Sequence, residues 1–192
     1  MDYKTELHNR IFTTERTRIK AEARLRFYEA AGQYLTAWYS VLLVVLTVFQ
    51  NILRQHFHFV DETTIALSVT VLAFTIAFSG LRFGQRAELY KTSYHALQRL
   101  RVSLNGPKDC DVSAVEREYI DILDSSPNHK DQDYNEFIVQ RSREGHRPDD
   151  IVRKPSKSEL SIYFWRKAIS RIVIFAAWLW PAVVAIWIYH VW

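Results

Sequence analysis

The sequence has few of the residues on which many small enzymes and metal-binding domains depend. It contains one cysteine, Cys110, which excludes a disulfide within the chain and any site built from several cysteines. A chain with so little cysteine fits soluble segments that face a reducing cytoplasm. Glycine is also scarce, at 5 of 192 residues, and no glycine-rich phosphate loop is present. We therefore expect no enzymatic activity of the nucleotide-dependent or multi-cysteine metal type.

Charge is absent from three long stretches, although 24% of all residues are charged. Residues 30–53, 63–81 and 172–192 contain no Asp, Glu, Lys or Arg and are 24, 19 and 21 residues long. A helix that spans a bilayer requires about 20 predominantly apolar residues. The sequence therefore predicts a membrane protein with three spans.

Basic residues are distributed unequally about these spans. Of the 25 Lys and Arg, 24 precede the first span or lie between the second and third, and only Arg54 falls in the short loop 54–62. Short cytoplasmic flanks retain Lys and Arg. We therefore expect a cytoplasmic N-terminus, a cytoplasmic middle region and an outside C-terminus. About 30 residues, mostly polar, precede the first apolar run, so we expect the N-terminal arm to be cytosolic and not a signal peptide.

The predicted fold is an all-α membrane protein. A nine-residue loop forces the first two spans into an antiparallel transmembrane hairpin, which carries long cytosolic helical extensions and is followed by a third, C-terminal span. The predicted segments are a cytosolic basic arm (1–34), the first span (35–53), an outer loop (54–62), the second span (63–81), a cytosolic helical region (82–139), a charged linker (140–157), an amphipathic juxtamembrane helix (158–171) and the third span (172–192).

Apolar spacing refines the soluble segments. Leu89, Leu97 and Leu104 continue one helical face beyond Arg82, so we expect the second span to run on without interruption to about residue 104. Val115, Tyr119 and two following apolar residues predict a further helix. Ser156 and Glu159 have the spacing of a capping box, which predicts a helix start before the third span.

Small polar residues recur at identical spacing in both hairpin helices, four, seven and four residues apart. These two polar stripes are Thr36, Ser40, Thr47 and Asn51 in the first span and Thr64, Ser68, Thr75 and Ser79 in the second. At 100° per residue each set covers an arc of about 60°. Such stripes either let helices approach and hydrogen-bond within a bundle, or line a water-filled path when several copies assemble.

The sequence offers no catalytic, cofactor-binding or metal site. His56 and His58 could bind a metal in the outer loop, but isolated loop histidines are far commoner. A basic cluster surrounds the predicted linker and consists of Arg141, Arg143, Arg147, Arg153, Lys154 and Lys157. Acidic residues dilute it and no aromatic stacking pattern accompanies it, which favours anionic lipid headgroups over nucleic acid as its partner.

The order of elements resembles a known family. A basic helix (RIKAEARLRFYEAAGQYLTAWYSVLL), a two-span hairpin and a long continuation (FSGLRFGQRAELYKTSYHALQRLRVSL) are similar to the SLATT domain, the two-transmembrane effector associated with SMODS and SLOG modules. The stretch EREYIDILDSSPNHKDQDYNEFIV resembles the subgroup found beside reverse transcriptases. The positions that carry the resemblance are Arg86, Ala87, Tyr90, Tyr94, Leu97, Tyr119, Asn128 and His129.

The resemblance implies an effector of a prokaryotic antiphage or conflict system in the bacterial inner membrane. Such an effector assembles as a homo-oligomer, forms a pore or otherwise permeabilises the membrane, and causes cell suicide or growth arrest. A cytosolic sensor or a reverse-transcriptase-type partner encoded nearby would activate it. The alternative is a membrane-anchored interaction or regulatory module that conducts nothing.

Overall fold

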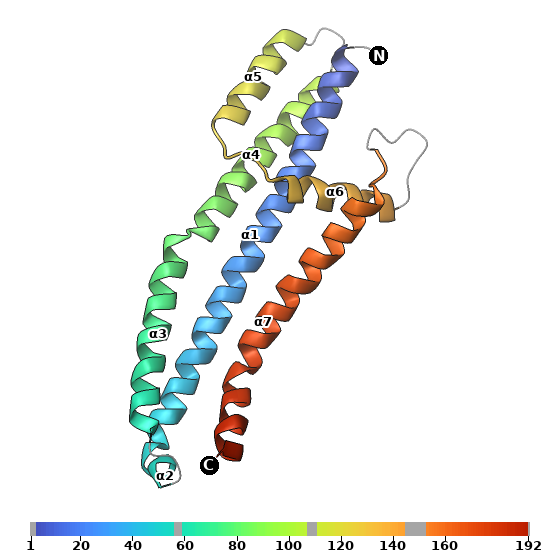
Figure 1. Ribbon diagram of the computed structural model, residues 1–192. Helices are drawn as coiled ribbons and strands as arrows, with labels where there is room; N and C mark the ends of the chain where they lie inside the picture. Colours follow the sequence, from blue (N-terminus) through green and yellow to red (C-terminus); the bar gives the residue numbers. More distant parts are fainter. Residues whose placement is uncertain (1–2, 56–58, 107–110, 145–152, 192) are drawn as a thin grey trace. The chain divides into compact units, whose positions relative to one another are not determined.

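The computed structural model describes residues 3–55, 59–106, 111–144 and 153–191, without the side chains of residues 182 and 184–191 (Figure 1). The secondary structure of this part of the chain is all α, as predicted. The helices are α1 (Tyr3–Val48), α2 (Gln50–Arg54), α3 (Val60–Gly80), α4 (Phe83–Leu104), α5 (Val112–Asp124), α6 (Asp131–Arg143) and α7 (Lys157–Val191). Cys110, His56, His58 and Arg147 lie outside the described residues.

The chain divides into two compact units. The first unit comprises Met1–Arg26 and Gly84–Ala168, and the second comprises Phe27–Phe83 and Ile169–Trp192. Helix α1 is continuous over 46 residues and contributes to both units. The predicted basic arm and the start of the predicted first span therefore belong to one helix.

The first unit has an apolar core between three helices. Leu7 and Ile11 of α1 pack against leucines of α4 and against α5. The core residues are Leu7, Ile11, Leu97, Leu100, Leu104, Val115 and Tyr119. A smaller cluster joins Phe137 and Ile138 of α6 to Phe12 of α1. Burial of these faces is what gives the otherwise charged helices a fixed arrangement.

Helix α5 is the helix predicted from the apolar spacing at Val115 and Tyr119, and Asp111 caps its start. The carboxylate of Asp111 accepts hydrogen bonds from the backbone N–H groups of Ser113 and Ala114, at 3.0 and 3.2 Å. This cap satisfies donors that have no partner within a helix. The predicted capping box before α7 is also confirmed: the Ser156 N–H donates to Glu159 at 2.8 Å, and the Glu159 N–H donates to the Ser156 hydroxyl at 3.2 Å.

The second unit contains the hairpin. The short α2 and the start of α3 are joined by Asp61, whose carboxylate accepts hydrogen bonds from Gln50 and Arg54 at 2.5 and 3.0 Å. The middle of α1 meets the end of α3 at Gly32, where Phe78 lies directly against the backbone. These two contacts, at opposite ends of α3, give the antiparallel arrangement expected for a hairpin.

Helix α7 also packs against α1 within the second unit. The indole rings of Trp38 and Trp178 are stacked, with centroids 4.9 Å apart and an interplanar angle of 19°. The hydroxyl of Tyr39 donates to the carbonyl oxygen of Ala177 at 2.8 Å. An aromatic stack and one hydrogen bond therefore attach this part of α7 to the hairpin.

Two helices are long and apolar enough to cross a membrane. They are Tyr3–Val48 and the segment Val60–Leu104, which contains α3 and α4, and their apolar windows are almost entirely unburied. Within the described residues the same test does not find a third span. The side chains of residues 184–191 and the whole of residue 192, near the end of the predicted third span, lie outside the described part of the chain.

The prediction that the second span runs on without interruption is wrong. Helix α3 ends at Gly80, α4 begins at Phe83, and Arg82 between them has a φ of 48°. The N–H groups of Leu81 and Arg82 close the last turn on the carbonyls of Phe78 and Ser79. A left-handed residue cannot continue a right-handed helix, so the two segments are separate elements.

The close approach at Gly32 predicts a specific intolerance to larger side chains. A Cβ atom at this position would lie 2.0 Å from Cζ of Phe78. We expect Gly32→Val to lower the free energy of unfolding of the detergent-solubilised chain by about 1–3 kcal/mol, because the ring must move. Combining it with Phe78→Ala should make the two effects clearly non-additive. Equal effects of Gly32→Val with and without the ring would contradict this contact.

Candidate functional site

One face of α1 is buried in the first unit and carries charge as well as apolar side chains. The face repeats every three or four residues and consists of Leu7, Ile11, Thr14, Arg18, Ala21 and Leu25. All six are buried, and Arg18 is 0% exposed. Arginine is rarely buried to this extent without a partner. The surroundings of this face therefore form the candidate site.

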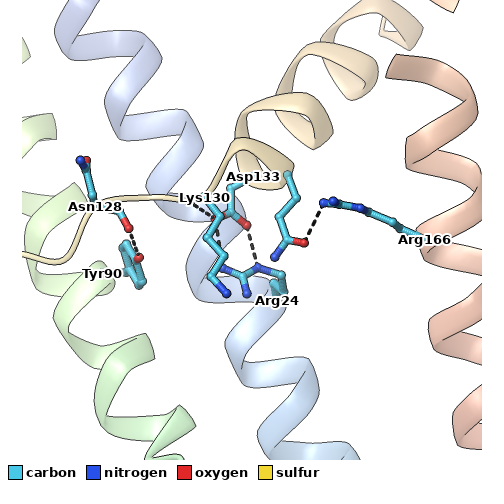
Figure 2. Close-up of polar contacts among 7 residues, drawn as sticks. Arg24, Tyr90, Asn128, Lys130, Asp133 and Arg166 are labelled. Atoms are coloured by element: carbon cyan, nitrogen blue, oxygen red, sulfur yellow. Dashed lines mark hydrogen bonds and ion pairs between the residues drawn. The ribbon is translucent and has the colours of Figure 1, made fainter. Parts of the chain in front are cut away.

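An ion pair joins α1 to α6 (Figure 2). The Nε and Nη2 atoms of Arg24 donate to the two carboxylate oxygens of Asp133 at 2.7 and 3.0 Å. Asp133 is fully buried and also accepts a hydrogen bond from the N–H of Lys130 at 3.0 Å. The carboxylate thus neutralises Arg24 and satisfies a donor at the start of α6, where negative charge is favoured.

Further polar contacts hold α6 in place. Lys20 of α1 donates to Gln140. Arg166 of α7, labelled in Figure 2, donates to the side-chain oxygen of Gln132 at 3.0 Å. Lys167 lies 3.8 Å from the carboxylate of Glu136. Within the first unit, α6 therefore has polar partners on both α1 and the start of α7.

The connection between α5 and α6, residues 125–130, packs over α4. The hydroxyl of Tyr90 donates to the carbonyl oxygen of Asn128 at 2.8 Å (Figure 2). Burial raises the pKa of Tyr90 above its usual value, so this hydroxyl keeps its proton at neutral pH. Burial, followed by the charge of Arg18, lowers the pKa of His129. His129 is therefore neutral at physiological pH.

Arg18 lies next to the same connection. Its Nη1 atom donates to the hydroxyl of Ser93 and, at 3.4 Å, to the carbonyl oxygen of Ile122. Ser93 and Ser126 share a hydrogen bond of 3.2 Å. The Nε and Nη2 atoms of Arg18 are buried and have no hydrogen-bond partner among the described residues. The site therefore contains a cation that its surroundings compensate only in part.

The structure brings together some of the positions at which the sequence resembles a known family. Tyr90, Asn128 and His129 lie in this site, and Tyr119 contacts the buried face of α1 through a 2.9 Å hydrogen bond to Thr14. Arg86 is close enough to influence the pKa of Tyr90. Tyr94 packs instead against its neighbour His95.

The charged residues at the centre of the site, Arg18, Arg24 and Asp133, are not among the site residues predicted from the sequence. In the sequence they stand within charged segments. A signal was available, because Arg18 falls in register with Leu7, Ile11 and Leu25 at the spacing of a buried helical face. No comparable signal indicates Asp133, whose partner is 109 positions away in the sequence.

The polar stripes lie in the second unit. Of their members, Thr36, Thr64 and Thr75 are half-buried and Ser40, Thr47, Asn51, Ser68 and Ser79 are exposed in the single chain. Five of the hydroxyls donate to a carbonyl of their own helix at 2.7–2.8 Å, namely Ser40, Thr47, Thr64, Ser68 and Thr75. Asn51 lies in α2, so the first stripe extends beyond the end of α1.

Among the described residues, no group of three or more His, Cys, Asp or Glu side chains is arranged to hold a metal ion. The basic cluster is partly neutralised, since Arg153 donates to Glu159 at 2.9 Å and Arg141 lies 3.7 Å from Glu144. The Arg153 guanidinium holds the pKa of Glu159 at about 2. This carboxylate therefore stays ionised and keeps its place at the start of α7.

The Arg24–Asp133 pair predicts a large and unequal response to mutation. Arg24→Met leaves a buried carboxylate without its cation, and we expect the free energy of unfolding to fall by about 3–5 kcal/mol. The double variant Arg24→Met/Asp133→Leu should recover much of this loss. Denaturant unfolding of the purified chain measures both. If the double variant loses as much unfolding free energy as Arg24→Met and Asp133→Leu lose together, the two residues do not form this pair.

Arg26 provides a matched control two positions along the same helix. Its guanidinium donates to Glu22 and Glu88 at 2.7 and 2.9 Å, but the pair is exposed. Exposed ion pairs contribute about 0–1 kcal/mol. Arg26→Met should therefore change stability far less than Arg24→Met.

Comparison with known proteins found one family and no individual relative. A search of curated proteins gave no match, and neither did a search of solved structures. Residues 1–189 match the family model described as SMODS and SLOG-associating 2TM effector domain family 5, SLATT_5. The match agrees with the two candidate membrane helices and extends over nearly the whole chain. The chain therefore belongs to the SLATT family of two-transmembrane effector domains, which occur in effectors of conflict and defence systems.

Proposed function

We propose that the protein is the membrane effector of a prokaryotic antiphage system and that it permeabilises the inner membrane by assembling into a pore. The observation that carries this proposal is the exposure of the polar stripes. Ser40, Thr47 and Ser68 are exposed in the single chain, so packing within the hairpin does not cover them. Several hairpins arranged with these stripes inward would enclose a polar lining, which one hairpin cannot do.

The hydrogen bonds of the stripes are compatible with this role. Hydroxyls that donate to their own helix, such as Ser40 to the Thr36 carbonyl at 2.8 Å, satisfy their proton without a second helix. Their oxygen atoms can still accept hydrogen bonds from water. These five hydroxyls therefore need no partner on another helix of the hairpin.

The proposed topology follows the distribution of basic residues. The first unit, with its buried arginines, would lie in the cytoplasm together with the N-terminus, and the second unit would lie in the membrane. The C-terminal half of α7, rich in tryptophan and free of charge, would form a third span that ends outside. The first unit would receive the signal from a cytosolic sensor or a reverse-transcriptase-type partner. We assign the chain no catalytic step and no direct nucleic-acid binding.

Inducible expression in bacteria with a membrane-potential dye tests the proposal. We expect depolarisation and growth arrest when the protein is expressed with its neighbouring genes under activating conditions. Thr75→Leu should reduce ion flux by altering the lining while leaving the amount of inserted protein unchanged. A folded, membrane-inserted oligomer that neither depolarises cells nor conducts in planar bilayers would contradict pore formation.

Thr70 supplies a control for this experiment. It is a threonine of the same helix, it is exposed, and its hydroxyl donates to the carbonyl of Ala66 at 2.8 Å, as that of Thr75 does to Val71 at 2.7 Å. At 100° per residue it lies about 150° from the middle of the stripe. Thr70→Leu should leave conductance unchanged. Equal effects of Thr70→Leu and Thr75→Leu would show that the stripe does not line the path.

A further inference from the structure

One edge of the Arg18 guanidinium, formed by Nε and Nη2, has no hydrogen-bond partner among the described residues of the first unit. Its Nη1 atom is occupied by Ser93 and the Ile122 carbonyl, whereas its Nε and Nη2 atoms are buried and without a partner in the described chain. These two atoms lie on the same side of the planar group and donate in parallel. This is the edge that binds a carboxylate or a phosphate through two hydrogen bonds.

Arg24 shows the same edge in use, about two helical turns along α1. There Nε and Nη2 bind the two oxygens of Asp133, at 2.7 and 3.0 Å. Arg18 is more deeply buried than Arg24, yet no carboxylate of the described residues forms an ion pair with it. A buried cation without an opposite charge is costly. An anion that occupied this edge would remove that cost.

Other polar groups converge on Arg18 from the elements around it. Ser93 of α4 and Ser126 of the α5–α6 connection share a hydrogen bond of 3.2 Å next to it. His129 is close enough for Arg18 to lower its pKa, and its Nδ1 atom is buried and has no partner among the described residues. Together with Arg18, these groups could hydrogen-bond to more oxygen atoms than the two of a carboxylate. The set suits a tetrahedral phosphate.

The α5–α6 connection lies next to Arg18. The Ser126 hydroxyl hydrogen-bonds to Ser93 and to the Ile122 carbonyl, the two groups that accept from Nη1 of Arg18. Residues 125–130 form no helix, and the Asn128 carbonyl accepts from Tyr90 at 2.8 Å. An anion that binds Nε and Nη2 would require this short connection to shift, and the shift would break these hydrogen bonds.

We propose that the first unit binds the phosphate group of a soluble compound next to the α5–α6 connection, with Nε and Nη2 of Arg18 as its principal donors. The site lies outside the polar stripes and does not depend on pore formation. Bound phosphate would link the α5–α6 connection to Arg18 on α1. The first unit would then have a ligand-bound conformation distinct from its free one.

Thermal unfolding of the full chain in a non-phosphate detergent tests the proposal with inorganic phosphate as the probe. We expect the Tm to rise with phosphate beyond the effect of sodium chloride at equal ionic strength. Arg18→Met should weaken phosphate binding by about 10- to 100-fold, the range expected for loss of charge-assisted hydrogen bonds. Arg18→Lys keeps the charge but lacks the paired edge, so it should lose most of the response as well.

Arg16→Met is the matched control, because Arg16 is exposed on the same helix. It should keep the full phosphate response. An equal response in wild type and Arg18→Met would overturn the proposal, as would a response to phosphatidic acid but none to inorganic phosphate. Since a variant could fail to fold, hydrogen exchange of the wild type provides a second measurement. Phosphate should slow exchange of the amides in residues 125–130, and unchanged exchange there would also overturn the proposal.

Discussion

Burial of arginine on helix α1 is the constraint on which the first unit depends. A guanidinium removed from water needs an opposite charge or a set of acceptors, because its desolvation is costly. Arg24 obtains a charge from Asp133, and this carboxylate also binds the backbone at the start of α6. Arg18 obtains acceptors from Ser93 and Ile122. Polar contacts of two buried cations, as well as apolar packing, therefore hold α4, α5 and α6 against α1.

The helices of the second unit are held together by other interactions than those of the first unit. Its charge-free segments have no ion pairs to arrange, and many of its hydroxyls are satisfied by their own helix. Most contacts between its long helices are made by aromatic rings and by the backbone at Gly32, with one hydrogen bond from Tyr39 to Ala177, and its ion pair, Arg54 with Asp61, lies at the hairpin turn. Helix α1 contributes residues to both units as one continuous helix. In the proposed function, the part of α1 with buried arginines would receive a signal, and the charge-free part of the same helix would insert into the membrane.

Several elements could be predicted from the sequence because local information decides them. A long run without charge predicts a candidate span, and spacing of apolar residues predicts α5, which begins at the cap formed by Asp111. The break at Arg82 could not be predicted in this way. The apolar spacing continues across the break, although Gly80 and Gly84 next to it disfavour helix, and the interruption resides in Arg82, whose φ is 48°. Composition and periodicity are insensitive to a single residue of this kind.

The sequence by itself determined the all-α class, two candidate spans and the family, since each depends on the order and composition of segments along the chain. Only the tertiary structure decided which of the charges are paired and with which groups. Apolar spacing places Arg18 on a buried face, but it does not reveal that Arg18 has an unpaired edge, that Arg24 holds a buried carboxylate or that Arg26 binds Glu88 on the surface. The physical reason is that compensation of a charge depends on distance in space, and these partners come from α4, α5 and α6, far along the chain.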